Sequence, residues 1–134
     1  NNDKKDIAIG VNIARQIGKL DLGQAAIIRN GVVLAIEGAD GTQAMLNRCS
    51  WLTSDIKSGV LVKLPKPGQE KRADMPTIGP DTVIGASEAS LSGIAVAAKT
   101  TIIIESDKVS TAADSAGIFV LGIKLDDYIT GYNN

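Results

Sequence analysis

Apolar residues recur along the chain in two patterns, one typical of amphipathic helices and one typical of buried strands. Between Asp3 and Lys19 they return every three or four positions, which predicts a helix covering a sheet. Short apolar runs rich in β-branched residues predict strands over 25–29, 32–37, 60–64, 93–97, 100–105 and 118–123. Further helices are predicted over 42–52 and 80–92, and a last one, capped by Ser106 or Asp107, is predicted to end at residue 116. This order of elements predicts an α/β fold, with a mixed sheet covered by helices in a single layered domain.

Local signals place the turns between these elements. Asn30-Gly31 lies between two predicted strands and is the strongest short signal for a hairpin. Pro80 is preorganised for the first position of a helix, and Gly117 is expected to end the last one. The residues after Ile123 are mostly polar, so we expect them to trail off without regular structure.

The longest polar segment joins the strand ending at Leu64 to the helix beginning at Pro80. Long loops in compact domains are usually functional or disordered. Two prolines, Pro67 and Pro76, hold the residues before them extended, which favours an ordered binding loop. Together with Lys63 at the end of the strand, its candidate polar residues are Lys66, Gln69, Glu70, Lys71, Arg72, Asp74 and Thr77. The cations among them suit phosphate oxygens by charge and, for arginine, by paired donors.

A second polar junction, EGADGT over residues 37–42, also lies between a predicted strand and a helix. It lacks the lysine of a P-loop, so taken alone it is most simply a structural turn. In open α/β sheets, ligands bind beyond the carboxyl ends of strands, where both junctions fall, and helix starts stabilise anions. We therefore expect Glu37, Lys63 and Asp74 to lie at one edge of the sheet.

Carboxylates at these junctions are candidates for a magnesium site. Asp74, Glu37 and Asp40 would supply oxygen ligands, with water and substrate phosphate completing the coordination. The alternative is a solvated charged loop in which Asp74 only pairs with Arg72.

Composition excludes several classes of function. The net charge is −1, and the aromatic residues are one tryptophan, two tyrosines and one phenylalanine, so the sequence does not favour nucleic acid as a partner. There is no histidine, which excludes histidine-based hydrolysis and zinc sites built on histidine. The single cysteine, Cys49, is expected to be buried and fits a reducing cytoplasm. No apolar run is long enough to suggest a membrane span.

The segments around both junctions resemble a known family. The stretches VVLAIEGADGTQAMLNR, GVLVKLPKPGQEKRADMPTIGPDTV and GIAVAA…IIIE…AGIFVLG together resemble the C-terminal domain of the UDP-2,3-diacylglucosamine pyrophosphatases of alphaproteobacterial type. The resemblance runs from about residue 25 to residue 123. Its pattern K-P-x-Q-x-x-R-x-D-[LM]-P-T-[IV]-G is far more specific than a glycine motif.

The resemblance implies a magnesium-dependent hydrolase of lipid A biosynthesis, which cleaves UDP-2,3-diacylglucosamine to UMP and a lipid 1-phosphate (lipid X). It implies that Asp74 is the catalytic, metal-associated aspartate, and that substrate-binding or metal-shell roles fall to Lys63, Lys66, Gln69, Arg72 and Thr77. Gln43 stands where the family usually has an acidic residue, so a metal ligand at the first junction depends on Glu37 and Asp40. The alternative from another class is a nucleotide-sugar or phosphate-binding module that does not catalyse.

The resemblance also implies a longer, two-domain protein, of which residues 1–134 would be the C-terminal catalytic half. The first residue is Asn1, not methionine, which fits an excised piece, so we expect little or no hydrolysis by these residues alone. The implied partners are the lipid substrate, the absent N-terminal domain and, transiently, the cytoplasmic surface of the membrane. A homo-oligomer is compatible with the sequence.

Overall fold

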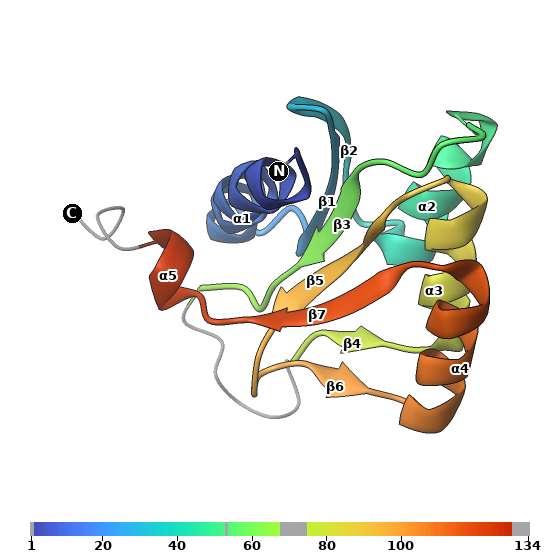
Figure 1. The fold of residues 1–134 in the computed structure, drawn as a ribbon. Coiled ribbons are helices and arrows are strands. Elements are labelled where there is room, and N and C mark those ends of the chain that lie inside the picture. The colour runs from blue at the N-terminus through green and yellow to red at the C-terminus, as the bar shows by residue number, and fades with distance from the viewer. Residues whose placement is uncertain (1, 53, 68–74, 130–134) are drawn as a thin grey trace.

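A five-stranded mixed sheet forms the centre of the fold, and helices cover both of its faces (Figure 1). The computed structural model describes residues 2–52, 54–67 and 75–129. Across the sheet, the strands lie in the order β2 (Val32–Ile36), β1 (Ala25–Arg29), β3 (Val60–Lys63), β5 (Gly93–Ala97) and β7 (Phe119–Ile123). The helices are α1 (Asn2–Lys19), α2 (Gly41–Cys49), α3 (Pro80–Glu88), α4 (Ser106–Ala116) and α5 (Asp126–Ile129). The predicted α/β class with a mixed sheet is confirmed.

The strand directions bring several strand ends to one edge. β1 is antiparallel to both of its neighbours, β2 and β3, while β3, β5 and β7 are parallel. β2 therefore runs in the same direction as β3. The carboxyl ends of β2, β3, β5 and β7 all lie at the same edge of the sheet, here called the carboxyl edge.

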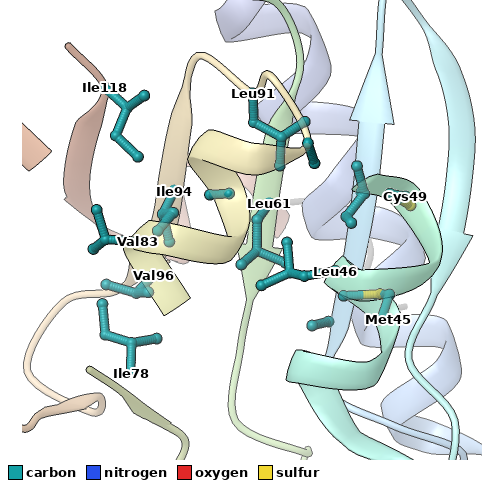
Figure 2. Close-up of a cluster of buried hydrophobic side chains, with 14 of the residues drawn as sticks. Met45, Leu46, Cys49, Leu61, Ile78, Val83, Leu91, Ile94, Val96 and Ile118 are labelled. Carbon is teal, nitrogen blue, oxygen red and sulfur yellow. The ribbon is translucent and has the colours of Figure 1, made fainter. Parts of the chain in front are cut away.

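Two apolar clusters hold the layers together. On one face, Ile7 and Val11 of α1 pack against Val60, Val62 and their neighbours. On the other, residues of α2, α3 and α4 share a larger cluster with the opposite side chains of the sheet. Figure 2 shows side chains of α2, α3 and the neighbouring strands in this cluster. Burying these side chains stabilises each helix on its face of the sheet.

The predicted burial of the single cysteine is confirmed. Cys49 is 3% exposed and belongs to the larger cluster. Burial raises the pKa of its thiol, while the charges of Arg48 and Arg29 act in the opposite direction. Such a thiol is typical of an inert core residue.

Some predicted boundaries are wrong. The predicted strand over 100–105 is only β6 (Ile102–Ile103), which pairs outside the main sheet with β4 (Thr77–Ile78), an element that was not predicted. α2 gives way to a 3-10 turn, Ser50–Leu52, and α3 ends at Glu88. The cap of α4 is Glu105, and the segment after Ile123 contains α5.

The Asn30-Gly31 hairpin forms as predicted. Both residues have positive φ, 49° and 82°, as a two-residue turn between twisted strands requires. Asp6 of α1, which is 1% exposed, accepts hydrogen bonds from the backbone N–H groups of Asn30 and Gly31 at 3.0 and 2.8 Å. One buried carboxylate thus fixes the hairpin to the helix behind it.

We expect Asp6→Ala to lower the free energy of unfolding by about 1–2 kcal/mol, because two turn N–H groups lose a charged acceptor. Asp6→Asn keeps one acceptor oxygen and should lose less. Urea unfolding of both variants measures the difference. Equal stability of Asp6→Ala and the unmodified chain would contradict this role.

Candidate functional site

Glu37 and Lys63 lie level with each other at the carboxyl edge, as predicted. Ala25 of β1 lies between them. It pairs with Lys63 of β3, and its carbonyl oxygen accepts a hydrogen bond from the N–H of Glu37, after β2, at 2.8 Å. Residues paired across strands project from the same face of a sheet. Ala25 belongs to the cluster beneath α2, α3 and α4, so Glu37 and Lys63 share that face.

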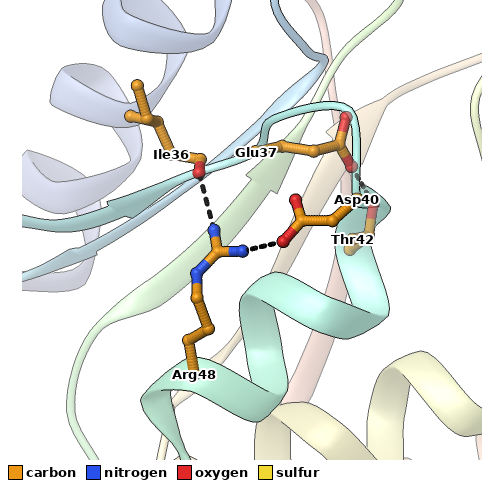
Figure 3. A network of polar contacts seen from close by, with 5 residues as sticks. All are labelled: Ile36, Glu37, Asp40, Thr42 and Arg48. Atoms are coloured by element: carbon orange, nitrogen blue, oxygen red, sulfur yellow. Dashed lines mark hydrogen bonds and ion pairs between the residues drawn. The ribbon is translucent and has the colours of Figure 1, made fainter.

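Both carboxylate oxygens of Glu37 are engaged. One oxygen accepts the backbone N–H of Gln24 at 2.7 Å, and the other accepts the hydroxyl of Thr42 in the first turn of α2 (Figure 3). Glu37 is only 7% exposed. A buried carboxylate is tolerated when its oxygens are hydrogen-bonded in this way.

Lys63 connects β3 to β4. Its Nζ donates to the carbonyl oxygen of Thr77 at 2.8 Å. Burial lowers the pKa of Lys63, and the negative charge of Glu37 partly offsets this by raising it. Together with Gln24 and Thr42, these residues form the carboxyl-edge cluster, defined as Gln24, Glu37, Thr42, Lys63 and Thr77.

The lowered pKa of Lys63 predicts a pH dependence of stability. In the unfolded chain a lysine has a pKa of about 10.4. Between the lowered pKa and that value the unfolded state binds more protons, so the contribution of Lys63 to the free energy of unfolding rises with pH. Urea unfolding from neutral to strongly alkaline pH should show this rise, and Lys63→Met should remove it. Lys57→Met, at an exposed position, controls for the loss of one cation; the same pH slope in both variants would contradict the prediction.

Asp40 does not join the carboxyl-edge cluster. Its carboxylate forms an ion pair with Arg48, whose guanidinium also donates to the carbonyl oxygen of Ile36 at 3.1 Å (Figure 3). The Asp40 side chain is 48% exposed. In this arrangement Asp40 points towards the end of α2, whereas Glu37 points towards its first turn.

Lys66 lies against the end of α1. Its Nζ is 2.5 Å from a carboxylate oxygen of Asp21, which has a positive φ of 58° in the turn after the helix. The hydrogen bond and the charge of Lys66 lower the pKa of Asp21. Pro67 lies so close to Gly18 that an added Cβ would be 3.0 Å from its ring. The start of the long loop is therefore held against the α1–β1 connection.

The remaining predicted site residues divide into two groups. Thr77 belongs to β4 and contributes its carbonyl oxygen to Lys63. Gln69, Arg72 and Asp74 lie outside the described residues, as do Glu70 and Lys71, so their predicted roles stay predictions.

The described carboxylates do not fit a magnesium site by themselves. Among residues 2–52, 54–67 and 75–129, no three cysteine, aspartate or glutamate side chains gather as metal ligands do. Glu37 uses both oxygens within the protein and Asp40 is paired with Arg48. Magnesium is usually held by one or two carboxylates together with water and substrate phosphates, so Asp74 is the candidate that stays open.

Sequence reasoning missed two partners of Glu37. Thr42 follows it by five residues at a helix start, where a hydroxyl commonly accepts or donates a local bond, so this contact had a recognisable signal. Gln24 contributes only its backbone N–H, which has no signature in the side-chain pattern.

The sequence of the chain is similar to that of a known protein family. The family model described as the LpxI C-terminal domain matches residues 1–121. The chain is also 44% identical, over 124 residues, to the UDP-2,3-diacylglucosamine pyrophosphatase LpxI of Caulobacter vibrioides; the match covers 88% of the chain and 44% of that relative. The chain thus spans less than half the length of the curated relative. Because the family model covers most of its length, the chain belongs to the LpxI C-terminal domain family.

Proposed function

We propose that the chain is the C-terminal part of a hydrolase of lipid A biosynthesis that cleaves the pyrophosphate of UDP-2,3-diacylglucosamine to UMP and 2,3-diacylglucosamine 1-phosphate (lipid X). The observation that carries this proposal is the 44% identity to a protein named for the same activity, over 88% of the chain. The sequence pattern around Asp74, which resembles the same family, agrees with it.

The carboxyl edge supplies the proposed substrate site. A diphosphate there would meet Lys66, whose partner Asp21 is 79% exposed, so that the ion pair is a weak surface pair that phosphate can replace. Lys63 contributes positive charge from within the edge, and we propose Gln69, Arg72 and Thr77 as further contacts. Asp74 is proposed to act at the reacting phosphate.

Magnesium is part of the proposal through Asp74. When bound, such an ion neutralises diphosphate charge and lowers the pKa of a bound water. Glu37 and Asp40 fit this role poorly because Glu37 is nearly buried and Asp40 is paired with Arg48. Their carboxylates instead bond to neighbouring parts of the protein at the carboxyl edge.

The proposed setting is the cytoplasm, with transient contact at the inner face of the membrane where the lipid substrate resides. Within the described part of the chain, no helix combines the length and hydrophobicity that a membrane span requires. We further propose that an N-terminal domain completes the site, since the curated relative is much longer than the matched region. A homo-oligomer is compatible with this proposal.

A non-catalytic module that binds a nucleotide sugar or phosphate is the second candidate. It is favoured by one observation: two of the three carboxylates predicted as metal ligands are engaged within the protein. Such a module needs the cations of the edge but no group that activates water.

The test is release of UMP from UDP-2,3-diacylglucosamine by the complete protein, with added magnesium and with EDTA. The proposed hydrolase should release UMP and lipid 1-phosphate in equal amounts, and EDTA should stop the reaction. Substrate binding without UMP release in magnesium would favour the binding module. Residues 1–134 alone are expected to release little or no UMP.

A further inference from the structure

One side chain, Glu37, connects the ends of three elements. It follows β2, its carboxylate accepts the N–H of Gln24 immediately before β1, and it also accepts the hydroxyl of Thr42 in α2. Its own N–H is bonded to Ala25 of β1. Hydrogen bonds to a charged acceptor are stronger than neutral ones, so this arrangement fixes the two strand ends and the helix start relative to one another.

The backbone at Gly23 lies against Glu37 on one side. A Cβ added to Gly23 would lie 2.2 Å from the carbonyl oxygen of Glu37 and 3.0 Å from its Cβ. The chain before β1 therefore passes directly against Glu37. Each carboxylate oxygen of Glu37 keeps a further lone pair, so what counts against a metal ion here is the 7% exposure of Glu37 and the lack, among the described residues, of two further cysteine, aspartate or glutamate side chains beside it.

Glu37 also acts on the next strand. Its negative charge faces Lys63 across Ala25, and Lys63 in turn holds Thr77 of β4. α3 begins three residues after Thr77, at Pro80. Hydrogen bonds and one charge interaction therefore connect Gln24, Glu37, Lys63 and Thr77 along the carboxyl edge.

We propose that Glu37 is a positioning residue, whose carboxylate holds β1, β2 and α2 together at the carboxyl edge and does not bind the metal ion. The inference rests on the proposed function only in taking the carboxyl edge as the place where substrate binds. It reassigns Glu37 from the metal-ligand role that its sequence position suggests.

The experiment compares Glu37→Gln and Glu37→Ala in the complete protein, with Asp40→Asn as the matched control. Glutamine keeps an acceptor for Gln24 and can donate its amide to the oxygen of Thr42, but it loses the charge that a metal ligand needs. Three quantities are measured: Mn²⁺ affinity by electron paramagnetic resonance, exchange of the Gln24 amide hydrogen, and kcat with KM for UMP release.

A positioning role predicts Mn²⁺ affinity unchanged in all three variants. Glu37→Gln should largely keep the protection of the Gln24 amide and most of kcat. Glu37→Ala should speed exchange of that amide about tenfold or more and lower kcat with it, because the bond is lost. Rescue by glutamine separates the loss of positioning from the loss of charge.

A loss of Mn²⁺ affinity of about tenfold or more in Glu37→Gln, with the Gln24 amide still protected, would overturn the inference in favour of a metal ligand. Unchanged Gln24 exchange in Glu37→Ala would also overturn it. The exchange measurement needs neither catalysis nor metal. Absence of UMP release by the unmodified protein would therefore count against the proposed function and leave the inference on Glu37 to be decided separately.

Discussion

Replacing Asp74 with alanine in the complete protein is expected to abolish turnover while leaving substrate binding intact. The cations proposed at the loop, among them Lys63 and Lys66, would still attract the diphosphate without this carboxylate, so its removal leaves the proposed binding charge in place. Loss of a group acting on the reacting centre typically costs about 10²–10⁴-fold in rate. Because repulsion towards the anionic substrate also falls, binding could tighten as turnover disappears.

The measurement is turnover and substrate affinity side by side for Asp74→Ala and Asp74→Asn. Asparagine keeps the size of the side chain and removes the charge, so both variants should be inactive. If Asp74 were only an ion-pair partner of Arg72, both would turn over almost normally and lose about 1 kcal/mol of stability or less. That outcome would contradict the catalytic role.

The largest loss of stability is expected from Gly23→Ala. The added methyl would lie 2.2 Å from the carbonyl oxygen of Glu37 and 2.8 Å from its carbonyl carbon, and both are backbone atoms that cannot rotate away. Relieving this contact must separate the chain before β1 from the end of β2, where Glu37 bonds to Gln24. We expect a decrease of about 3 kcal/mol or more in the free energy of unfolding.

Gly38→Ala is the matched control for this variant. It lies next to Glu37, and its added Cβ would have only an ordinary contact, 3.6 Å from a carboxylate oxygen of Asp40. Its stability should stay within about 0.5 kcal/mol of the unmodified chain. Urea unfolding measures the free energy of unfolding of both variants. Comparable values for the two would contradict the prediction that the close approach at Gly23 matters for stability.

The fold was predictable where the side-chain pattern is long or the turn chemistry is specific. The apolar spacing of α1 and the runs of β1, β3 and β5 match their burial in the structure. Asn30-Gly31 predicted the hairpin because few other residue pairs accept two positive φ angles. Gly117 predicted the end of α4 for the same reason, and its φ is 69°.

Two helices end with motifs that lack the expected glycine. At the end of α3, Ser90 has a φ of 59°, and the N–H of Leu91 bonds back to the carbonyl oxygen of Ala86. Asp21 has the same role after α1, with a φ of 58°. The end of α3 was not predictable because serine seldom adopts this conformation, whereas the predicted end of α1 at Lys19 agrees with the structure. β4 was missed, and β6 was predicted too long, because two-residue strands are too short to show a pattern.

The position of the candidate site was predictable in part, but the bonding partners of its residues were not. The rule that ligands bind beyond the carboxyl ends of strands placed Glu37 and Lys63 at one edge. In the structure Glu37 follows β2, Lys63 ends β3, and these two strands run in the same direction. Their partners were not predictable, because Lys63 bonds a backbone carbonyl and Glu37 a backbone N–H. Contacts of this kind depend on how the chain passes through space, which side-chain patterns do not record.

The central claim is that substrate binds at the carboxyl edge of the sheet. The most direct test is hydrogen–deuterium exchange of the complete protein, with and without UDP-2,3-diacylglucosamine, followed by peptide mass spectrometry. Ligand-dependent protection is predicted in peptides covering residues 37–42 and 63–79. Protection confined to the opposite edge of the sheet, around the Asn30-Gly31 turn and Ser90, with none at residues 37–42 or 63–79, would contradict the claim.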